Sequence, residues 1–158
     1  MVQIQKINAH DFAFWCDQVA ELFNSSVKIN FPEFMVNGNY GNDKCNEVAT
    51  FLKDGTAIVF VAIEQDKLIG WIWCHKINRL DRMRLHIAEI AVFDDYQKRG
   101  VGSQLLDKVE EYAIENGYFE IDLLVTASNI SAVRFYEESL YRTERYLMKK
   151  DVKRRFDN

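Results

Sequence analysis

A short polar turn carries the strongest chemical signal in this 158-residue sequence. It contains two glycines, Gly100 and Gly102, and a helix is expected to begin between them at Val101. The first backbone N–H groups of a helix have no intrahelical partner, and the helix dipole favours an anion beside them. Glycine lets a ligand approach the backbone because it has no Cβ atom. The turn therefore predicts a phosphate-binding site, with donors and positive charge at its rim from Gln97, Lys98 and Arg99.

Two familiar phosphate motifs are excluded by the residues around these glycines. A Walker A loop requires a Gly-Lys-Ser/Thr ending, and Val101-Gly-Ser103 has no lysine. A dinucleotide fingerprint requires a third glycine where this chain has Leu105. The alternative without a ligand is that both glycines only tighten a strand-to-helix turn.

Composition and charge narrow the class of protein. The formal net charge is −4 and 48% of the residues are hydrophobic, which suits one globular domain and argues against general nucleic-acid binding. No apolar run reaches membrane-spanning length, and the N-terminus has no signal-peptide pattern. Cys16, Cys45 and Cys74 lie far apart, with no metal-ligand spacing among cysteine and histidine. We therefore expect a reduced, metal-free protein of the cytoplasm that binds neither membrane nor nucleic acid.

The hydrophobic pattern predicts the elements that position the turn, in the order β-α-α-β-β-β-α-β-α-β. An asparagine- and glycine-rich stretch over 37–46 indicates a surface loop. The expected strands are 2–7, 57–63, 67–77, 85–93, 119–125 and 141–149; the expected helices begin at Asn8 or His10 and span 43–52, 101–116 and 130–139.

Several spaced motifs in this order resemble the GNAT N-acetyltransferase superfamily. They are Lys67-Leu-Ile-Gly70, Gln97–Gly102 after Ile90-Ala-Val92, Thr126-Ala-Ser-Asn129 and Ala132–Glu137. The resemblance covers residues 56–148 well and residues 1–55 only in element order. It implies an α/β (α+β) fold with a mixed central sheet of about six to seven strands and about four helices. Residues 1–158 would form one domain, with an acceptor-side region (1–55) and an acetyl-CoA-binding core (56–148).

The resemblance also implies how acetyl-CoA is held. The pyrophosphate would lie on the backbone N–H groups of Arg99, Gly100, Val101, Gly102 and Ser103. The backbone of Ile90, Ala91 and Val92 would pair with the pantetheine arm, as an added strand does. A bulge near Glu89 to Ala91 would free an N–H for the thioester carbonyl. Asn129 would contact the pantetheine chain, cap the helix that follows it, or do both.

Two side chains are candidates for proton transfer to and from a primary amine acceptor, of a small molecule or a peptide. Glu89 is the candidate general base, an ionisable residue in an apolar strand that alternation places on one face with Ile87 and Ala91. An exposed strand-face carboxylate is the equal alternative. The resemblance makes Tyr136 the candidate acid for the CoA thiolate; a packed helix aromatic is its alternative.

Two departures from the family pattern bear on the acceptor and on one turn. Leu124 stands where ribosomal-protein alanine acetyltransferases have their proposed basic glutamate. Leu140-Tyr141 replaces the common Gly-Phe after the last helix. A non-catalytic, regulatory acetyl-CoA-binding module is therefore the alternative function, and a nucleotide-phosphate-binding protein is a third. A homodimer is compatible with the aromatic strands expected near the C-terminus.

Overall fold

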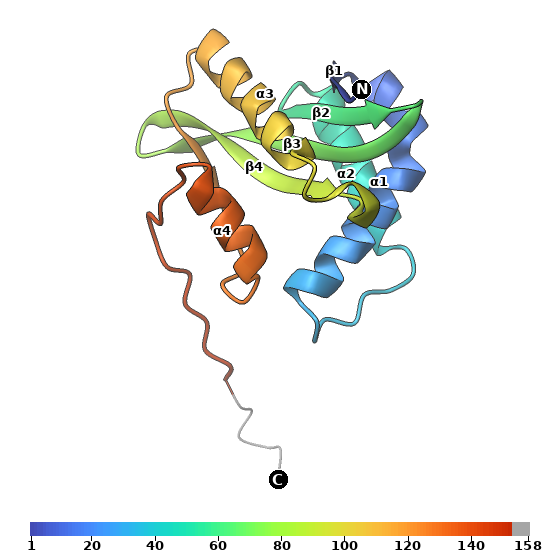
Figure 1. Cartoon of the computed structure of the whole chain (residues 1–158). Helices are drawn as coiled ribbons and strands as arrows, with labels where there is room; N and C mark the ends of the chain where they lie inside the picture. The colour runs from blue at the N-terminus through green and yellow to red at the C-terminus, as the bar shows by residue number, and fades with distance from the viewer. Residues whose placement is uncertain (153–158) are drawn as a thin grey trace.

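Helices cover both faces of a five-stranded mixed sheet in the computed structural model, which describes residues 1–152 (Figure 1). The strands lie side by side in sequence order, with all neighbours antiparallel except β4 and β5, which are parallel. In chain order the elements are β1 (Gln3–Ile7), α1 (Ala9–Asn30), α2 (Tyr40–Lys53), β2 (Ala57–Glu64), β3 (Lys67–Arg79), β4 (Arg82–Val92), the 3-10 turn η1 (Asp94–Tyr96), α3 (Val101–Glu115), β5 (Ile121–Leu123) and α4 (Ile130–Glu138).

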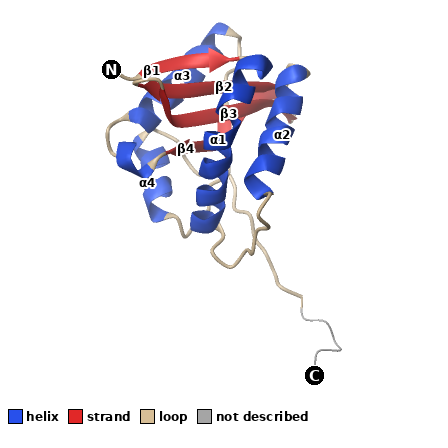
Figure 2. Cartoon of the chain, turned by 90° about the vertical axis from the view of Figure 1, so that its right-hand side faces the viewer, coloured by secondary structure: helices blue, strands red, loops and turns tan. Residues whose placement is uncertain are grey.

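The two N-terminal helices cover one face of the sheet (Figure 2). The Asn8 side chain caps α1 by accepting a hydrogen bond from the Asp11 N–H at 2.9 Å. The predicted apolar face of α1 is buried against this side of the sheet, at Phe12, Trp15, Val19, Leu22 and Phe23. Neither the 22-residue α1 nor any other helix among residues 1–152 has the length and hydropathy of a bilayer-crossing segment.

Helix α2 begins at Tyr40, inside the stretch that the sequence predicted to be a loop. Gly41 explains the difference, because its backbone fits against helix α1. Its N–H donates to the Asn24 side-chain oxygen at 3.0 Å, and a Cβ atom here would overlap the Ala20 carbonyl group. The α1–α2 contact therefore extends the helix by three residues beyond the predicted start at Asp43.

The opposite face of the sheet is covered mainly by α3, whose apolar residues lie in the second core cluster. Leu105, Leu106, Val109 and Ala113 are buried as predicted, while Tyr112 packs at the margin. Part of α4 adds to this cluster through Phe135 and Tyr136. The crossover from β4 through α3 to β5 thus joins the one parallel strand pair of residues 1–152.

The predicted last strand over 141–149 was wrong, which lowers the strand count from the expected six to seven to five. The segment after α4 is extended but pairs with no strand within residues 1–152, and its last described residues leave the body of the molecule (Figure 1). Leu140 takes the left-handed conformation (φ 66°) usual for glycine at this turn. The replacement of glycine therefore leaves the turn geometry in place but strains it.

Candidate active site

Strand β4 divides into a paired half and an open half. Leu85, His86 and Ile87 pair with β5, and the pairing stops there. From Ala88 to Val92 the outer edge of β4 has no strand partner within residues 1–152. A strand with an unpaired edge presents free backbone donors and acceptors to any extended ligand.

The hydrogen bonds between β4 and β3 show which backbone groups face this open edge. The Phe93 N–H donates to the Ile69 carbonyl of β3 at 3.0 Å. Because backbone groups alternate along an antiparallel strand, Ala91 also faces β3, whereas Ile90 and Val92 face the open edge. Two of the three residues predicted to pair with pantetheine therefore present their backbone there.

A β-bulge at Ala88 decides the direction of the Glu89 side chain. The β3–β4 register moves from Cys74 opposite Ile87 to Trp73 opposite Glu89, so Ala88 is the extra residue. The bulge was predicted near Glu89 to Ala91, and it lies directly before Glu89. Since the extra residue interrupts the alternation, Ile87 packs in the α3 cluster and Ala91 in the α1–α2 cluster. The prediction that Ile87 and Ala91 share a face was therefore wrong.

Glu89 lies on the α1–α2 side, where its carboxylate is enclosed. The atom Oε1 is inaccessible to solvent and has no hydrogen-bond partner within residues 1–152. Burial raises the pKa of Glu89 to about 7, and the Ser26 hydroxyl and the positive charge of Lys44 partly oppose this rise. A carboxyl group that titrates near neutral pH can both accept and release a proton under physiological conditions. The alternative of an exposed strand-face carboxylate is thus wrong.

Tyr136 approaches the same opening from the α3–α4 side. Its ring packs beside those of Phe135 (5.3 Å between centroids) and Tyr141 (5.7 Å). Burial raises the pKa of the Tyr136 hydroxyl, and the negative charge of Glu89 raises it further. The charge of Glu89 thus acts on Tyr136, although the two predicted proton-transfer residues belong to opposite faces of the sheet.

The polar turn before α3 has the conformation of an anion site at its backbone. The first bond of the helix joins the Gln104 N–H to the Gly100 carbonyl at 3.0 Å. The N–H groups of Val101, Gly102 and Ser103 are therefore left without helix partners. Gly100 adopts φ 76°, which requires glycine for an unstrained backbone, and nothing lies within 4 Å of where its Cβ would be.

Two of the three polar side chains of this turn have contacts within the protein. Gln97 donates through Nε2 to the Val92 carbonyl at 3.0 Å and to Asp94 at 2.9 Å, so its amide holds the turn together. The Arg99 guanidinium lies 5.1 Å from the Tyr96 ring. The third, Lys98, is exposed and has φ 59°; among residues 1–152 its side chain has no hydrogen bond, ion pair or contact with an aromatic ring.

Gly102 has a packing role that the sequence did not reveal. A Cβ atom at this position would lie 3.2 Å from the tip of the Phe135 ring. The missing side chain thus allows α4 to approach α3, which brings Tyr136 toward the open half of β4. Close packing of α4 against α3 is therefore a second reason for glycine at this position, besides the approach of a ligand.

Asn129 uses both ends of its amide within the protein. Its oxygen accepts from the Ala132 N–H at 3.2 Å and caps α4, as one of the two predicted roles requires. Its Nδ2 donates to the Asn30 oxygen at 3.0 Å, across 99 positions of sequence. The contact between α4 and the end of α1 was not predicted, because no local pattern links the two segments.

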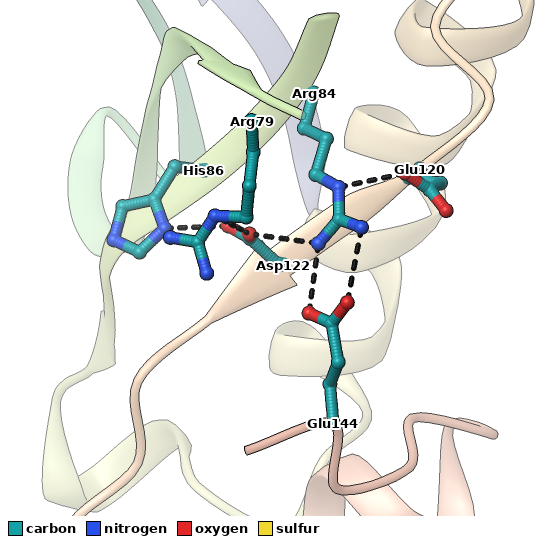
Figure 3. A network of polar contacts seen from close by, with 6 residues as sticks. All are labelled: Arg79, Arg84, His86, Glu120, Asp122 and Glu144. Carbon is teal, nitrogen blue, oxygen red and sulfur yellow. Dashed lines mark hydrogen bonds and ion pairs between the residues drawn. The ribbon is translucent and has the colours of Figure 1, made fainter. Parts of the chain in front are cut away.

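The paired half of β4 carries a different kind of polar cluster (Figure 3). Arg84, only 8% exposed, binds Glu144 through two nitrogens at 2.8 and 3.1 Å and Glu120 at 2.6 Å. His86 Nδ1 lies 2.6 Å from Asp122, which also contacts Arg84 at 3.4 Å and Arg79 at 3.7 Å. The charged groups of this cluster are thus satisfied by one another.

The known proteins that this chain resembles include several named acetyltransferases. A sequence profile described as "Acetyltransferase (GNAT) family" matches residues 20–140. Streptothricin acetyltransferase A of Bacillus subtilis (strain 168) is 48% identical over 82 residues, which are 47% of this chain and 47% of that protein. The chain thus spans about half the length of this curated relative.

Solved structures share the fold over almost the whole chain. An aminoglycoside acetyltransferase, meta-AAC0020 from an uncultured soil metagenomic sample, solved in complex with sisomicin, superposes with a TM-score of 0.74 and 17% identity, covering 96% of this chain and 97% of that one. A predicted acetyltransferase from Clostridium acetobutylicum, solved with acetyl-CoA, gives 0.74 and 12%, covering 95% and 96%. The profile match spans most of the chain, and the chain belongs to the GNAT acetyltransferase family.

Proposed function

We propose that the protein is an acetyl-CoA-dependent N-acetyltransferase that acetylates a primary amine by direct attack. One observation carries the proposal: where the edge of β4 opens, the enclosed Glu89 Oε1 has no hydrogen-bond partner within residues 1–152, and the negative charge of Glu89 raises the pKa of the Tyr136 hydroxyl. An ordered donor and acceptor at an open strand edge suit an acyl transfer between two bound substrates. Because family members use acetyl-CoA, the free edge and the start of α3 supply the matching contacts for its pantetheine arm and pyrophosphate.

The proposed chemistry uses each group once. Glu89 takes a proton from the acceptor ammonium, directly or through water, and the free amine attacks the thioester carbonyl. The carbonyl oxygen becomes negative, and an outward N–H of the open edge, at Ile90 or Val92, stabilises it. The C–S bond then breaks, and the Tyr136 hydroxyl donates its proton to the CoA thiolate. The hydroxyl is protonated at neutral pH, and its raised pKa makes it a weaker acid than an ordinary tyrosine, so its assignment depends on its position beside the opening.

We propose a small cationic molecule with several amines as the acceptor. The negative carboxylate of Glu89, with a pKa near 7, attracts an ammonium group, and the chain has a net charge of −4. The related streptothricin acetyltransferase and the fold neighbour solved with sisomicin are named for such molecules. The acceptor would enter from the α1–α2 side, where Tyr40 and Lys44 stand near Glu89. The three free cysteines, Cys16, Cys45 and Cys74, support a reducing compartment such as the cytoplasm.

A thiol-release screen tests the function. Purified protein and acetyl-CoA are incubated with polyamine antibiotics, small monoamines and peptides, and free CoA is measured. We expect thiol release with at least one polyamine and a mass gain of one acetyl group on it. Acetyl-CoA binding by calorimetry without thiol release from any amine would instead favour the regulatory module. The absence of acetyl-CoA binding would overturn both functions.

A further inference from the structure

Two enclosed polar atoms without hydrogen-bond partners belong to residues that face each other across strands β3 and β4. Trp73 is only 8% exposed, and its indole Nε1 has no hydrogen-bond partner within residues 1–152. Glu89 Oε1 is likewise enclosed and without a partner among these residues. Trp73 and Glu89 are directly opposite each other in the β3–β4 register. The indole N–H can only donate a hydrogen bond, and an ionised carboxylate can only accept one.

Both side chains belong to the same face of the sheet. Trp73 packs in the α1–α2 cluster, and so does Ala91, which follows Glu89 by two residues. Because side chains alternate along a strand, Glu89 lies on that face as well. Residues directly opposite each other on one face of an antiparallel pair have Cβ atoms about 5 Å apart. The two side chains are therefore neighbours, yet their polar atoms do not bond to each other.

The chemistry of the two groups restricts what can bind between them. The indole N–H requires a lone pair, and the ionised carboxylate requires a donor. An ammonium group has no lone pair, and a neutral amine that gave its lone pair to the indole would have none left to attack a thioester. Water or a hydroxyl group supplies both a lone pair and a proton. The position between Trp73 and Glu89 therefore suits an oxygen atom and not the reacting amine itself.

We propose that Trp73 is a positioning residue whose indole N–H holds an oxygen atom, of water or of an acceptor hydroxyl group, against Glu89 Oε1. The inference rests on the proposed role of Glu89 as the base. The oxygen relays a proton, because it takes one from the acceptor ammonium and gives its own to the carboxylate. The amine is then neutral, Glu89 is protonated, and the oxygen again carries the number of protons with which it began.

The indole protons of the three tryptophans test this position without any substrate, in nitrogen-15-edited NMR spectra. Ionisation of Glu89 changes the hydrogen bonds of the bridging oxygen, so the Trp73 signal should shift with the same midpoint pH as the Glu89 carboxyl carbon. Before an acceptor binds, the oxygen is that of water, so this proton should also give a nuclear Overhauser effect to water. Trp71 is the matched control. Its N–H is also buried without a partner among residues 1–152, but Ala91 stands opposite it, and its signal should not follow Glu89.

Other titratable groups near the pair are separated from Glu89 by two variants. The His75 ring lies 5.6 Å from the Trp73 ring, and its titration would also move the indole signal. We therefore expect Glu89→Gln to remove the pH-dependent shift of Trp73 and His75→Gln to keep it. The other ionisable side chains that influence Glu89 come from α2 and α4: Tyr40, Lys44 and Tyr136.

Trp73→Phe tests the position during turnover. The variant keeps an aromatic ring beside Phe51 and removes the N–H. We expect kcat to fall about tenfold while KM for acetyl-CoA stays within about twofold, and Trp71→Phe should leave kcat within about twofold. An equal fall for a simple alkylamine and for an amine with a hydroxyl group identifies the oxygen as water. A fall confined to the hydroxyl-bearing amine identifies it as the acceptor's own hydroxyl.

The outcomes separate this inference from the proposed function. The positioning role is overturned if the Trp73 indole proton gives no Overhauser effect to water or if its shift follows His75 instead of Glu89, even in a protein that acetylates an amine. An unchanged kcat in Trp73→Phe overturns it as well. A shared titration with the effect to water, in a protein that acetylates no amine, leaves the bridged pair standing and removes the proposed function.

Discussion

The two halves of strand β4 differ in whether their charged side chains have hydrogen-bond partners within the protein. In the paired half, Arg84 is enclosed by Glu120 and Glu144, and His86 by Asp122, so each charge has a partner of opposite sign or a strong hydrogen bond. In the open half, the Glu89 side chain is half-buried with its Oε1 atom enclosed, yet this atom has no hydrogen-bond partner within residues 1–152. The halves are separated by one extra residue, Ala88.

This contrast distinguishes a structural cluster from a reactive group. A buried polar atom without a partner is destabilising, so the folded chain tolerates it where another molecule supplies the partner. The charged groups of the paired half already bind one another, so they are not free to bind a substrate. We therefore expect substitutions in the open half to change catalysis, and substitutions in the paired half to change stability.

Glu89→Gln tests the open half most severely. We expect kcat/KM for the acetylated amine to fall by roughly a thousandfold, because the amide cannot accept the proton, while acetyl-CoA affinity by calorimetry stays within about twofold. In the wild type, the rate should fall as the pH drops below about 7, where Glu89 becomes protonated, and the variant should lack this limb. Glu120→Gln makes the same chemical change in the paired half and should keep the limb. Loss of acetyl-CoA binding in Glu89→Gln would mean that the residue supports the fold instead.

Tyr136→Phe removes one oxygen on the other side of the opening. We expect kcat to fall by about 10- to 100-fold with little change in KM, since the hydroxyl acts when the thiolate departs. Steady-state kinetics with both substrates measures this split. Tyr112→Phe on α3 is the control, because its ring packs with Phe60 and Tyr118 away from the open edge. A rise in KM at unchanged kcat would assign Tyr136 to binding.

The sequence predicted the helices and the local cap around this site better than the strand pairing and the long-range contacts. The apolar spacing of α1 and α3 and the Asn129 cap are local patterns, and the structure confirms them. The strand over 141–149 failed because strand-favouring residues do not reveal whether a sheet edge will pair with them. The bulge at Ala88 directly precedes the predicted stretch from Glu89 to Ala91, and its exact residue depends on the register with the partner strand. Asn30 had no local signal, because its partner Asn129 lies 99 positions away along the chain.

Arg84→Met tests whether the ion pairs of the paired half stabilise the fold. The variant leaves Glu120, Asp122 and Glu144 close together without their main cation, and we expect the Tm at pH 7 to fall by roughly 5 °C. Arg84 lowers the pKa of Glu144, so this stabilisation is present above the carboxylate's unfolded pKa and is lost as the pH falls through the folded value. The Tm difference between the two proteins should therefore narrow in acid. Calorimetric scans from pH 7 to pH 3.5 measure it, and a difference that widens in acid would contradict the ion-pair explanation.

His86→Asn should have the smallest effect on catalysis and gives the sharpest test of the comparison. His86 and Asp122 form a His–carboxylate pair of the kind that orients a general base in many enzymes. Here Asp122 also contacts Arg84 and Arg79, so it belongs to the cluster that stabilises the end of the sheet. An asparagine places its amide nitrogen near the position of Nδ1 and can keep the hydrogen bond to Asp122. We expect kcat/KM to stay within about twofold and the acid limb to remain.

A histidine base and a glutamate with a pKa near 7 both lose activity toward acid, so the wild-type profile alone does not distinguish them. The two variants, His86→Asn and Glu89→Gln, do distinguish them. If His86→Asn removed the acid limb and Glu89→Gln retained it, the reactive group would lie in the paired half, and satisfied hydrogen bonding would no longer separate structural charges from catalytic ones in this protein.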